Sequence, residues 1–213
     1  AELLVAKVLA DDGSGYTSDV MAGVEWAVEQ GADVINLSLG SDEPSDGTDA
    51  LSVLCDMVWA QDIVVCVAAG NMGPAAGTVG SPGSARVVIT VGASTDENEV
   101  APFSARGPTL DGRLKPDILF PGVGIIAARA SGTRMGNPLD DHYTELSGTS
   151  MATPHASGAC ALLLQARPDL KPDSIKKVLM GTALDLGLEP NEQGAGLANV
   201  YAASRSMPPV PKP

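Results

Sequence analysis

The sequence predicts an α/β domain with a mostly parallel β-sheet and helices on both faces. Two observations lead to this fold class. Short runs rich in Val and Ile alternate along the chain with longer helical patterns, and these runs are almost continuously apolar. Such strands are buried on both faces, which is the arrangement of parallel sheets. The 213 residues, of which 44% are hydrophobic, suffice for one large domain with a sizeable core.

The first half of the chain supplies most of the predicted sheet. Strands are expected at residues 3–9, 32–39, 63–69 and 87–93, and helices at residues 18–30 and 49–61. Gly31 follows the first helix and ends it. The segment 70–83 is rich in Gly, Pro and Ser, so we expect a loop there.

The second half is more irregular until its long helix. A turn-rich segment covers residues 95–112, and short strands are expected around Ile118 and Ile125. Residues 148–166 predict a long buried helix, and residues 172–180 a helix with Pro172 in its first turn. Residues 207–213 are predicted to form a proline-rich tail, which leaves 1–206 as the domain.

Composition excludes several classes of function. The chain has 13 basic and 26 acidic residues, a net charge of −13, and such a surface repels phosphate backbones, so we expect no nucleic-acid partner. No apolar run reaches the roughly 18 residues of a membrane helix, so we expect no membrane partner. The start of the chain lacks the basic leader of a signal peptide, and the localisation stays open between secreted and bacterial cytoplasmic.

The three cysteines do not predict a disulfide framework. Cys66 lies in an apolar strand and Cys160 in an Ala- and Leu-rich helix, so both are expected to be small buried residues. Neither has the neighbouring His or the turn that a catalytic cysteine requires.

Ser150 is the first candidate for chemistry. The turn Gly148-Thr149-Ser150 opens the long helix and places the serine at its N-terminus. Unpaired backbone N–H groups and the positive end of the helix dipole favour developing negative charge there. An ordinary helix cap is the structural alternative.

Asn71 is the second candidate. It follows the predicted strand 63–69 and Gly70, which puts a side-chain amide at the carboxyl edge of a parallel sheet, where α/β sites form. An amide there can donate a hydrogen bond to an oxyanion. A turn-forming Asn is the structural alternative.

Taken together, these segments resemble the subtilisin-like serine proteases, the subtilases. Residues 148–152 are similar to the family's nucleophile motif and residues 68–71 to its oxyanion-hole motif. Residues 33–40, Ser81-Pro82, Phe103-Ser104 and Lys115-Pro116-Asp117 also occur in family order, and the resemblance spans residues 1–204. It implies a three-layer subtilisin-like fold, of which the chain is the C-terminal two-thirds of the catalytic domain.

The resemblance also implies roles for particular residues. Ser150 would attack the scissile carbonyl and form an acyl-enzyme, while the Asn71 side chain holds the oxyanion. Polypeptide substrate would be added as a strand between residues 13–15 and 38–40, and Gly80 would form the base of a pocket for a large apolar side chain, with no charge nearby. The substrate-binding residues implied are Gly13, Ser14, Gly15, Ser38, Leu39, Gly40, Ala68, Ala69, Gly70 and Gly80.

The acid and base of the triad are not found in this sequence. They precede the serine in the order Asp, His, Ser, and both family motifs would lie upstream of residue 1. His155 is about 140° around the helix from Ser150, so it is expected to pack against the helix's surroundings, and His142 lies in a polar loop. The resemblance therefore implies that Asp and His come from a missing or separate N-terminal segment, with a fragment chain as partner.

Two further readings and one structural expectation follow. A non-catalytic peptide-binding relic of a subtilase is the alternative function, and an α/β-hydrolase esterase is disfavoured because Ala152 stands where its motif requires Gly. No cofactor is needed for the chemistry; structural calcium is common in the family, but no ligands or metal site can be named. Absent neighbouring strands would expose one flank of the sheet, whose buried layer should include Val5, Val8, Val34 and Val65.

Overall fold

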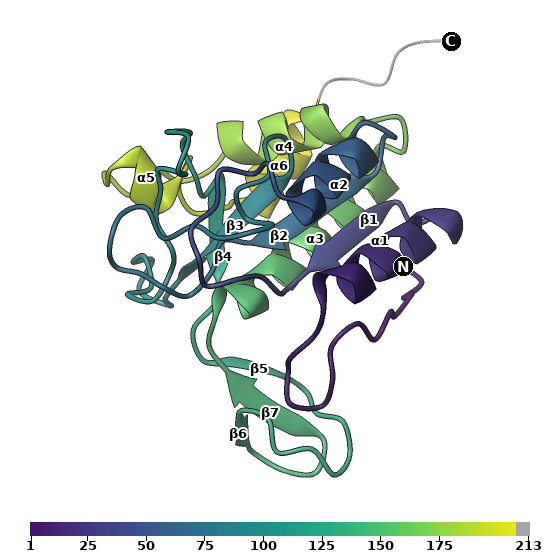
Figure 1. Ribbon diagram of the computed structural model, residues 1–213. Helices are drawn as coiled ribbons and strands as arrows, with labels where there is room; N and C mark the ends of the chain where they lie inside the picture. Colours follow the sequence, from purple (N-terminus) through teal and green to yellow (C-terminus); the bar gives the residue numbers. More distant parts are fainter. Residues whose placement is uncertain (208–213) are drawn as a thin grey trace.

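A four-stranded parallel sheet forms the centre of the computed structural model, which describes residues 1–207 (Figure 1). The strands follow each other in sequence order, β1-β2-β3-β4, and β1 pairs with β2 in the register Ile35 to Val65. Their bounds are β1 Val34–Leu37, β2 Val64–Ala68, β3 Ile89–Ser94 and β4 Ile118–Pro121.

Helices cover both faces of this sheet, as predicted. The long helix α3 packs across all four strands, and α2 packs against β2 and against α1. Figure 1 shows α3 behind the sheet and α1 and α2 in front of it. The helices are α1 Thr17–Glu29, α2 Ala50–Trp59, α3 Thr149–Ala166, α4 Pro172–Gly181, α5 Pro190–Gln193 and α6 Val200–Ser206.

The core lies between β2 and β3 and the helices on either side. Every residue of β2 is buried, as the continuous apolar run predicted, because helices cover it on both faces. Cys55, Cys66 and Cys160 are free and buried, and the Sγ atoms of Cys66 and Cys160 lie 3.9 Å apart between β2 and α3. Small residues such as Ala156 let α3 approach the sheet closely.

A second, antiparallel sheet projects from the body of the molecule (Figure 1). It has the strand order β5-β7-β6, with β5 at Ile125–Ala128, β6 at Asn137–Pro138 and β7 at Tyr143–Leu146. The sequence predicted a strand near Ile125 but not this separate sheet, nor helices α5 and α6.

The predicted strand at residues 3–9 is wrong. These residues form no regular element, and the side chains of Leu3 and Val5 are 86% and 81% exposed. A strand requires a hydrogen-bonded neighbour, and among the described residues β1 pairs with β2 alone. Val5 is therefore outside the buried layer, whereas Val65 is fully buried and Val8 and Val34 are partly so.

Two sequence expectations, on the proline-rich tail and on membrane-spanning helices, can be compared with residues 1–207 only. Of the predicted tail at 207–213, only Met207 is described, and the remainder lies outside the described residues. Within residues 1–207, no helix combines the length and apolarity that crossing a membrane requires.

Candidate active site

A cleft of about 680 Å³ opens at the carboxyl ends of β1 and β2. Its walls come from the loop after β1, the loop after β2, the start of α3 and the segment 9–20. Loops at this end of a parallel sheet converge, which is why α/β proteins place their sites there. All twelve residues that the sequence singled out line this one cleft, although they come from five separate segments: Gly13, Ser14, Gly15, Ser38, Leu39, Gly40, Ala68, Ala69, Gly70, Asn71, Gly80 and Ser150.

Ser150 is the second residue of α3 and is half-buried at the cleft wall. Gly148 is the N-cap, and its N–H donates to the Gly122 carbonyl at 2.8 Å. A Cβ at Gly122 would lie 2.8 Å from the Gly148 carbonyl, so only glycine allows this approach. This contact fixes the position of the N-terminus of α3. The Ser150 backbone N–H belongs to the first turn of the helix, whose N–H groups have no carbonyl partner within the helix.

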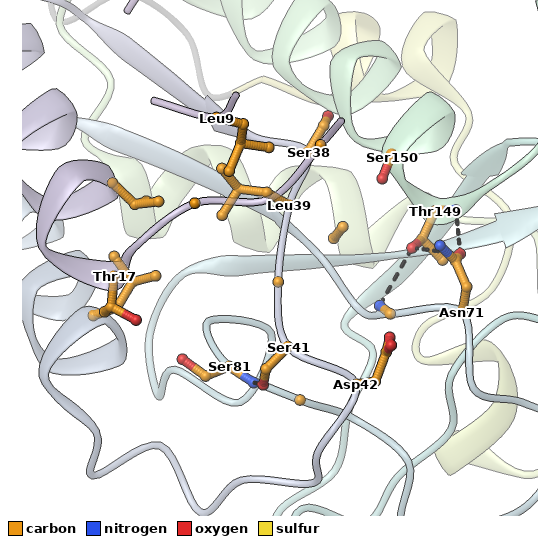
Figure 2. Close-up of a pocket in the computed structure, with 18 of the residues that line it drawn as sticks. Leu9, Thr17, Ser38, Leu39, Ser41, Asp42, Asn71, Ser81, Thr149 and Ser150 are labelled. Carbon is orange, nitrogen blue, oxygen red and sulfur yellow. Dashed lines mark hydrogen bonds between the residues drawn. The ribbon is translucent and has the colours of Figure 1, made fainter. Parts of the chain in front are cut away.

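Asn71 reaches the same point from the loop after β2. Its Oδ1 accepts hydrogen bonds from the Thr149 backbone N–H at 2.9 Å and from the Thr149 hydroxyl at 3.0 Å. The Thr149 hydroxyl in turn accepts the Gly70 N–H at 3.3 Å. Because two donors hold the amide oxygen, the amide NH₂ is the end left to donate into the cleft (Figure 2).

Thr149 is a candidate site residue that the sequence reasoning missed. It is fully buried and joins the loop that carries Asn71 to the helix that carries Ser150. Its position directly before the candidate nucleophile was the only available signal. Sequence alone does not show that a hydroxyl there meets an amide 78 residues away.

The two segments that would hold substrate both line the cleft. The loop after β1 contributes Ser38 to Gly40, and in the described chain neither Leu39 nor Gly40 uses its backbone N–H or carbonyl in a backbone hydrogen bond. Those groups are free to pair with an added strand. Gly13 has φ +83°, which favours glycine, and its segment also lines the cleft.

Gly80 lines the cleft, but its Cβ position faces neighbouring backbone and not the open space expected at the base of a pocket. A Cβ built on it would lie 2.0 Å from the Ser41 carbonyl oxygen, so a side chain there would enter the neighbouring backbone. Gly80 is therefore needed where the loop after β1 crosses it, and Pro44 forms an antiparallel bridge with it. A larger residue at this position would displace that loop instead of simply filling a pocket.

The expectation of an uncharged cleft is also wrong. Asp42 and Asp49 both line it. Partial burial raises the pKa of the Asp49 carboxyl, but hydrogen bonds from Ser81, Ser52 and Ser45 outweigh burial and hold the pKa below its usual value. Asp49 thus stays ionised at neutral pH.

Neither histidine takes part in the cleft. His155 is exposed on α3, and its Nδ1 lies 2.9 Å from the Met151 carbonyl oxygen, so the expected packing role is wrong. His142 is exposed beside β7. Among residues 1–207, no histidine lines the cleft, and no group of three His, Cys, Asp or Glu side chains is placed to hold a metal ion.

Comparisons with known proteins agree with this geometry. The chain is 42% identical to the serine protease AprX of Bacillus subtilis strain 168 over 98% of this chain and 52% of that protein. It is 40% identical to subtilisin DY of Bacillus licheniformis over 95% of this chain and 68% of that protein, so it spans half to two-thirds of these relatives. The structure of the prenylagaramide maturation protease PagA matches 92% of this chain and 70% of its own, with a TM-score of 0.77 and 27% identity. Since the model of the subtilase family also matches residues 1–196, the chain belongs to the subtilase family.

Proposed function

We propose that this chain is the nucleophile-bearing part of a serine endopeptidase that cleaves polypeptides. Ser150 attacks the scissile carbonyl carbon, and the resulting tetrahedral oxyanion is held by the Asn71 amide NH₂ and the Ser150 N–H. The triad His takes the Ser150 hydroxyl proton during the attack and gives it to the departing amine as the intermediate collapses. The acyl group left on Ser150 is then hydrolysed by water, which releases the new carboxyl end. The observation that carries the proposal is the convergence of Ser150 and Asn71 on Thr149 at one wall of the cleft.

Asp and His of the triad are proposed to come from an N-terminal segment, either upstream in the same polypeptide or on a separate fragment. Two observations support this. Within the described residues no histidine lines the cleft, and the chain spans only 52% of AprX. The term completed enzyme is used below for this chain combined with a subtilase segment that carries both residues.

The test is covalent labelling of Ser150 with a fluorophosphonate. In the chain alone the hydroxyl has no base to accept its proton, so labelling should be slow. The oxyanion donors and binding alone leave residual peptide hydrolysis roughly 10³–10⁴-fold above that in water, a magnitude established for subtilisin itself. Any peptide cleavage by the chain alone should therefore be very slow. In the completed enzyme labelling should be rapid and stoichiometric.

The control is Ser150→Ala, which should abolish labelling in both forms. Peptide cleavage should appear only in the completed enzyme with Ser150 intact. If the completed enzyme binds peptides in the cleft but neither labels nor cleaves, the chain is instead a peptide-binding relic of a protease. Rapid labelling of the chain alone would show that the missing base is not needed.

A further inference from the structure

The charges along the cleft are all of one sign. Two of the described residues that line the cleft, Asp42 and Asp49, carry a formal charge. No Lys, Arg or His of the described chain lines it. The net charge of −13 over the whole chain adds a negative field at long range. From the described residues of this chain, a bound peptide therefore meets two carboxylates and no cation.

The two carboxylates differ in what they already hold. Asp49 caps α2, and its oxygens accept hydrogen bonds from Ser52, Ser81 and Ser45 at 2.6–2.9 Å. Asp42 has no hydrogen bond or ion pair with any other residue of the described chain, and its carboxylate points across the cleft towards the side of Asn71 and Thr149 (Figure 2). Asp42 is thus the carboxylate whose pairing capacity is free.

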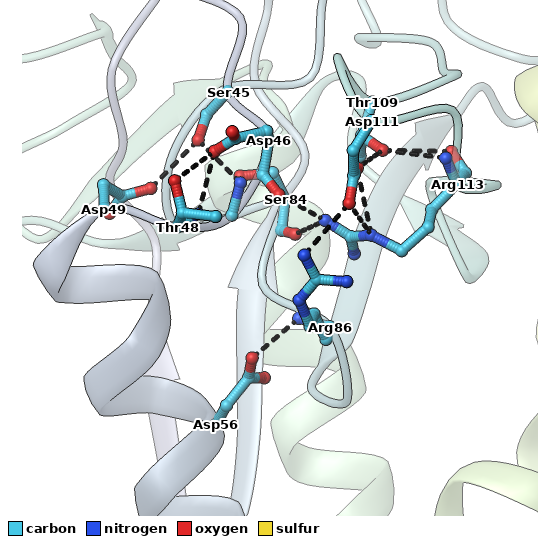
Figure 3. Close-up of polar contacts among 11 residues, drawn as sticks. Ser45, Asp46, Thr48, Asp49, Asp56, Ser84, Arg86, Thr109, Asp111 and Arg113 are labelled. Atoms are coloured by element: carbon cyan, nitrogen blue, oxygen red, sulfur yellow. Dashed lines mark hydrogen bonds and ion pairs between the residues drawn. The ribbon is translucent and has the colours of Figure 1, made fainter.

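The loop that carries Asp42 is anchored at both sides of it. The Ser41 N–H donates to the Ser81 carbonyl at 2.8 Å, and the Ser45 N–H donates to the Val79 carbonyl at 3.1 Å. Beyond Ser45, the Arg113 guanidinium donates to the Asp46 carbonyl at 2.8 Å and to the Ser84 carbonyl at 2.7 Å (Figure 3). A carboxylate on a loop held this way loses little conformational freedom when it pairs with a ligand.

We propose that Asp42 makes the cleft selective for a substrate with a Lys or Arg side chain beside the bond that Ser150 attacks. The inference rests on the proposed function and names its substrate class. The small side chains of Ala68 and Ala69 leave room for the methylene stem of such a residue, while its charged end reaches Asp42. The ammonium or guanidinium then forms a charge-assisted hydrogen bond with the exposed Asp42 carboxylate at the cleft.

Binding is measured separately from catalysis, in the completed enzyme with Ser150→Ala. Two peptides are compared that differ at one position, lysine against norleucine, which keeps a straight aliphatic chain and removes the charge. Calorimetry should show that the lysine peptide binds about twofold to fivefold more tightly at low salt, the range of an exposed ion pair. The preference should shrink as the salt concentration rises.

Asp42→Asn should make the affinities for the two peptides equal. Glu43→Gln is the matched control, because Glu43 is the exposed neighbouring acid outside the cleft lining, and it should keep the preference. Equal affinities in the parent, no binding of either peptide, or an equal loss of preference in both variants would overturn the role of Asp42.

A parallel cleavage assay with Ser150 intact separates the two proposals. Cleavage of both peptides at the same kcat/KM would overturn the selectivity and leave the peptidase function standing. A lysine preference in binding without cleavage of either peptide would support the selectivity and overturn the peptidase function. A higher kcat/KM for the lysine peptide that Asp42→Asn removes would support both.

Discussion

At the scale of single residues, the candidate site depends on Thr149 as much as on Ser150. Its backbone N–H and hydroxyl both donate to the Asn71 oxygen, and the hydroxyl also accepts the Gly70 N–H. The two donors leave the amide only one orientation, with its NH₂ turned towards the cleft. We therefore propose Thr149 as a positioning residue, which would act on the reacting atoms through Asn71.

Thr149→Val tests this role. Valine keeps the shape and the backbone N–H but removes the hydroxyl, so the amide of Asn71 loses one of its two anchors. In the completed enzyme we expect kcat to fall by about tenfold with little change in KM, because misplaced donors stabilise the transition state less. Thr149→Ser, which restores the hydroxyl, should recover most of the loss.

Asn71→Ala sets the scale for that experiment. It should lower kcat by roughly 10²–10³-fold, a magnitude known for the loss of such a donor in a subtilisin and not obtained from this structure. A fall in thermal stability without a change in kcat for Thr149→Val would mean that the hydroxyl is only structural.

At the scale of secondary-structure elements, β3 and β4 are joined by a buried charge cluster. The Asp117 carboxylate accepts the Thr90 N–H at 2.7 Å and pairs with Lys115 at 2.8 Å and with Lys176 of α4 at 2.9 Å. Burial lowers the pKa of Lys115 to about 8, which the attraction of Asp117 only partly opposes. The Asp117 side chain thus connects the start of β4 to β3 and to α4.

Asp117→Asn should destabilise the protein by about 3–5 kcal/mol, because it leaves the Lys115 ammonium buried without its anion. Urea unfolding at pH 7 measures the loss. Asp62→Asn is the control: Asp62 pairs with Lys171 at 2.7 Å, but both side chains are more than half exposed, so the cost should stay within about 1 kcal/mol. Similar losses in the two variants would contradict the structural role of the cluster.

The same carboxylate predicts a dependence on pH. Burial raises the pKa of Asp117, but Lys115, Lys176 and the Thr90 N–H outweigh it and hold the pKa below its usual value. A lowered pKa contributes stability above the unfolded value of about 4 and loses it as the pH falls further. The difference in unfolding free energy between the parent and Asp117→Asn should therefore narrow below about pH 4.

At the scale of the whole molecule, the sheet has a free edge. β1 pairs with β2 on one side only among the described strands, and the apolar residues Leu3 and Val5, upstream of α1, are exposed and belong to no strand. An open edge of a buried parallel sheet carries unpaired backbone groups. This arrangement fits the proposal that an N-terminal segment completes the sheet as well as the triad.

Hydrogen exchange tests that proposal without relying on activity. In the completed enzyme, amides of β1 and of residues 3–9 should exchange more slowly than in this chain alone, because new strands pair with them. Residues of β3, which lies between β2 and β4 in both cases, are the internal control. Unchanged exchange at β1 together with full activity would show that the segment completes the site without completing the sheet.

The sequence by itself determined the fold class, the family and twelve of the residues that line the cleft. Continuous Val and Ile runs favour strands that are buried on both faces. Motifs such as 68–71 and 148–152 are local, so they can be recognised without coordinates. The strand predicted at 3–9 does not form, although its apolar pattern resembles that of the buried strands. Its apolar pattern describes a preference for burial, and a pattern does not supply the neighbour that burial requires.

Only the tertiary structure decided what surrounds those residues. The Thr149 hydroxyl donates to the Asn71 amide oxygen, and Gly80 lies against the Ser41 backbone, although both pairs are far apart in the sequence. Asp42 lines the cleft, and nothing in its local sequence indicated that position. Hydrogen bonds, close backbone approaches and the free pairing capacity of a carboxylate depend on distances between segments. Those distances are set when the loops at the carboxyl ends of β1 and β2 are brought together by the packing of the sheet and α3, and no single segment of the sequence encodes them.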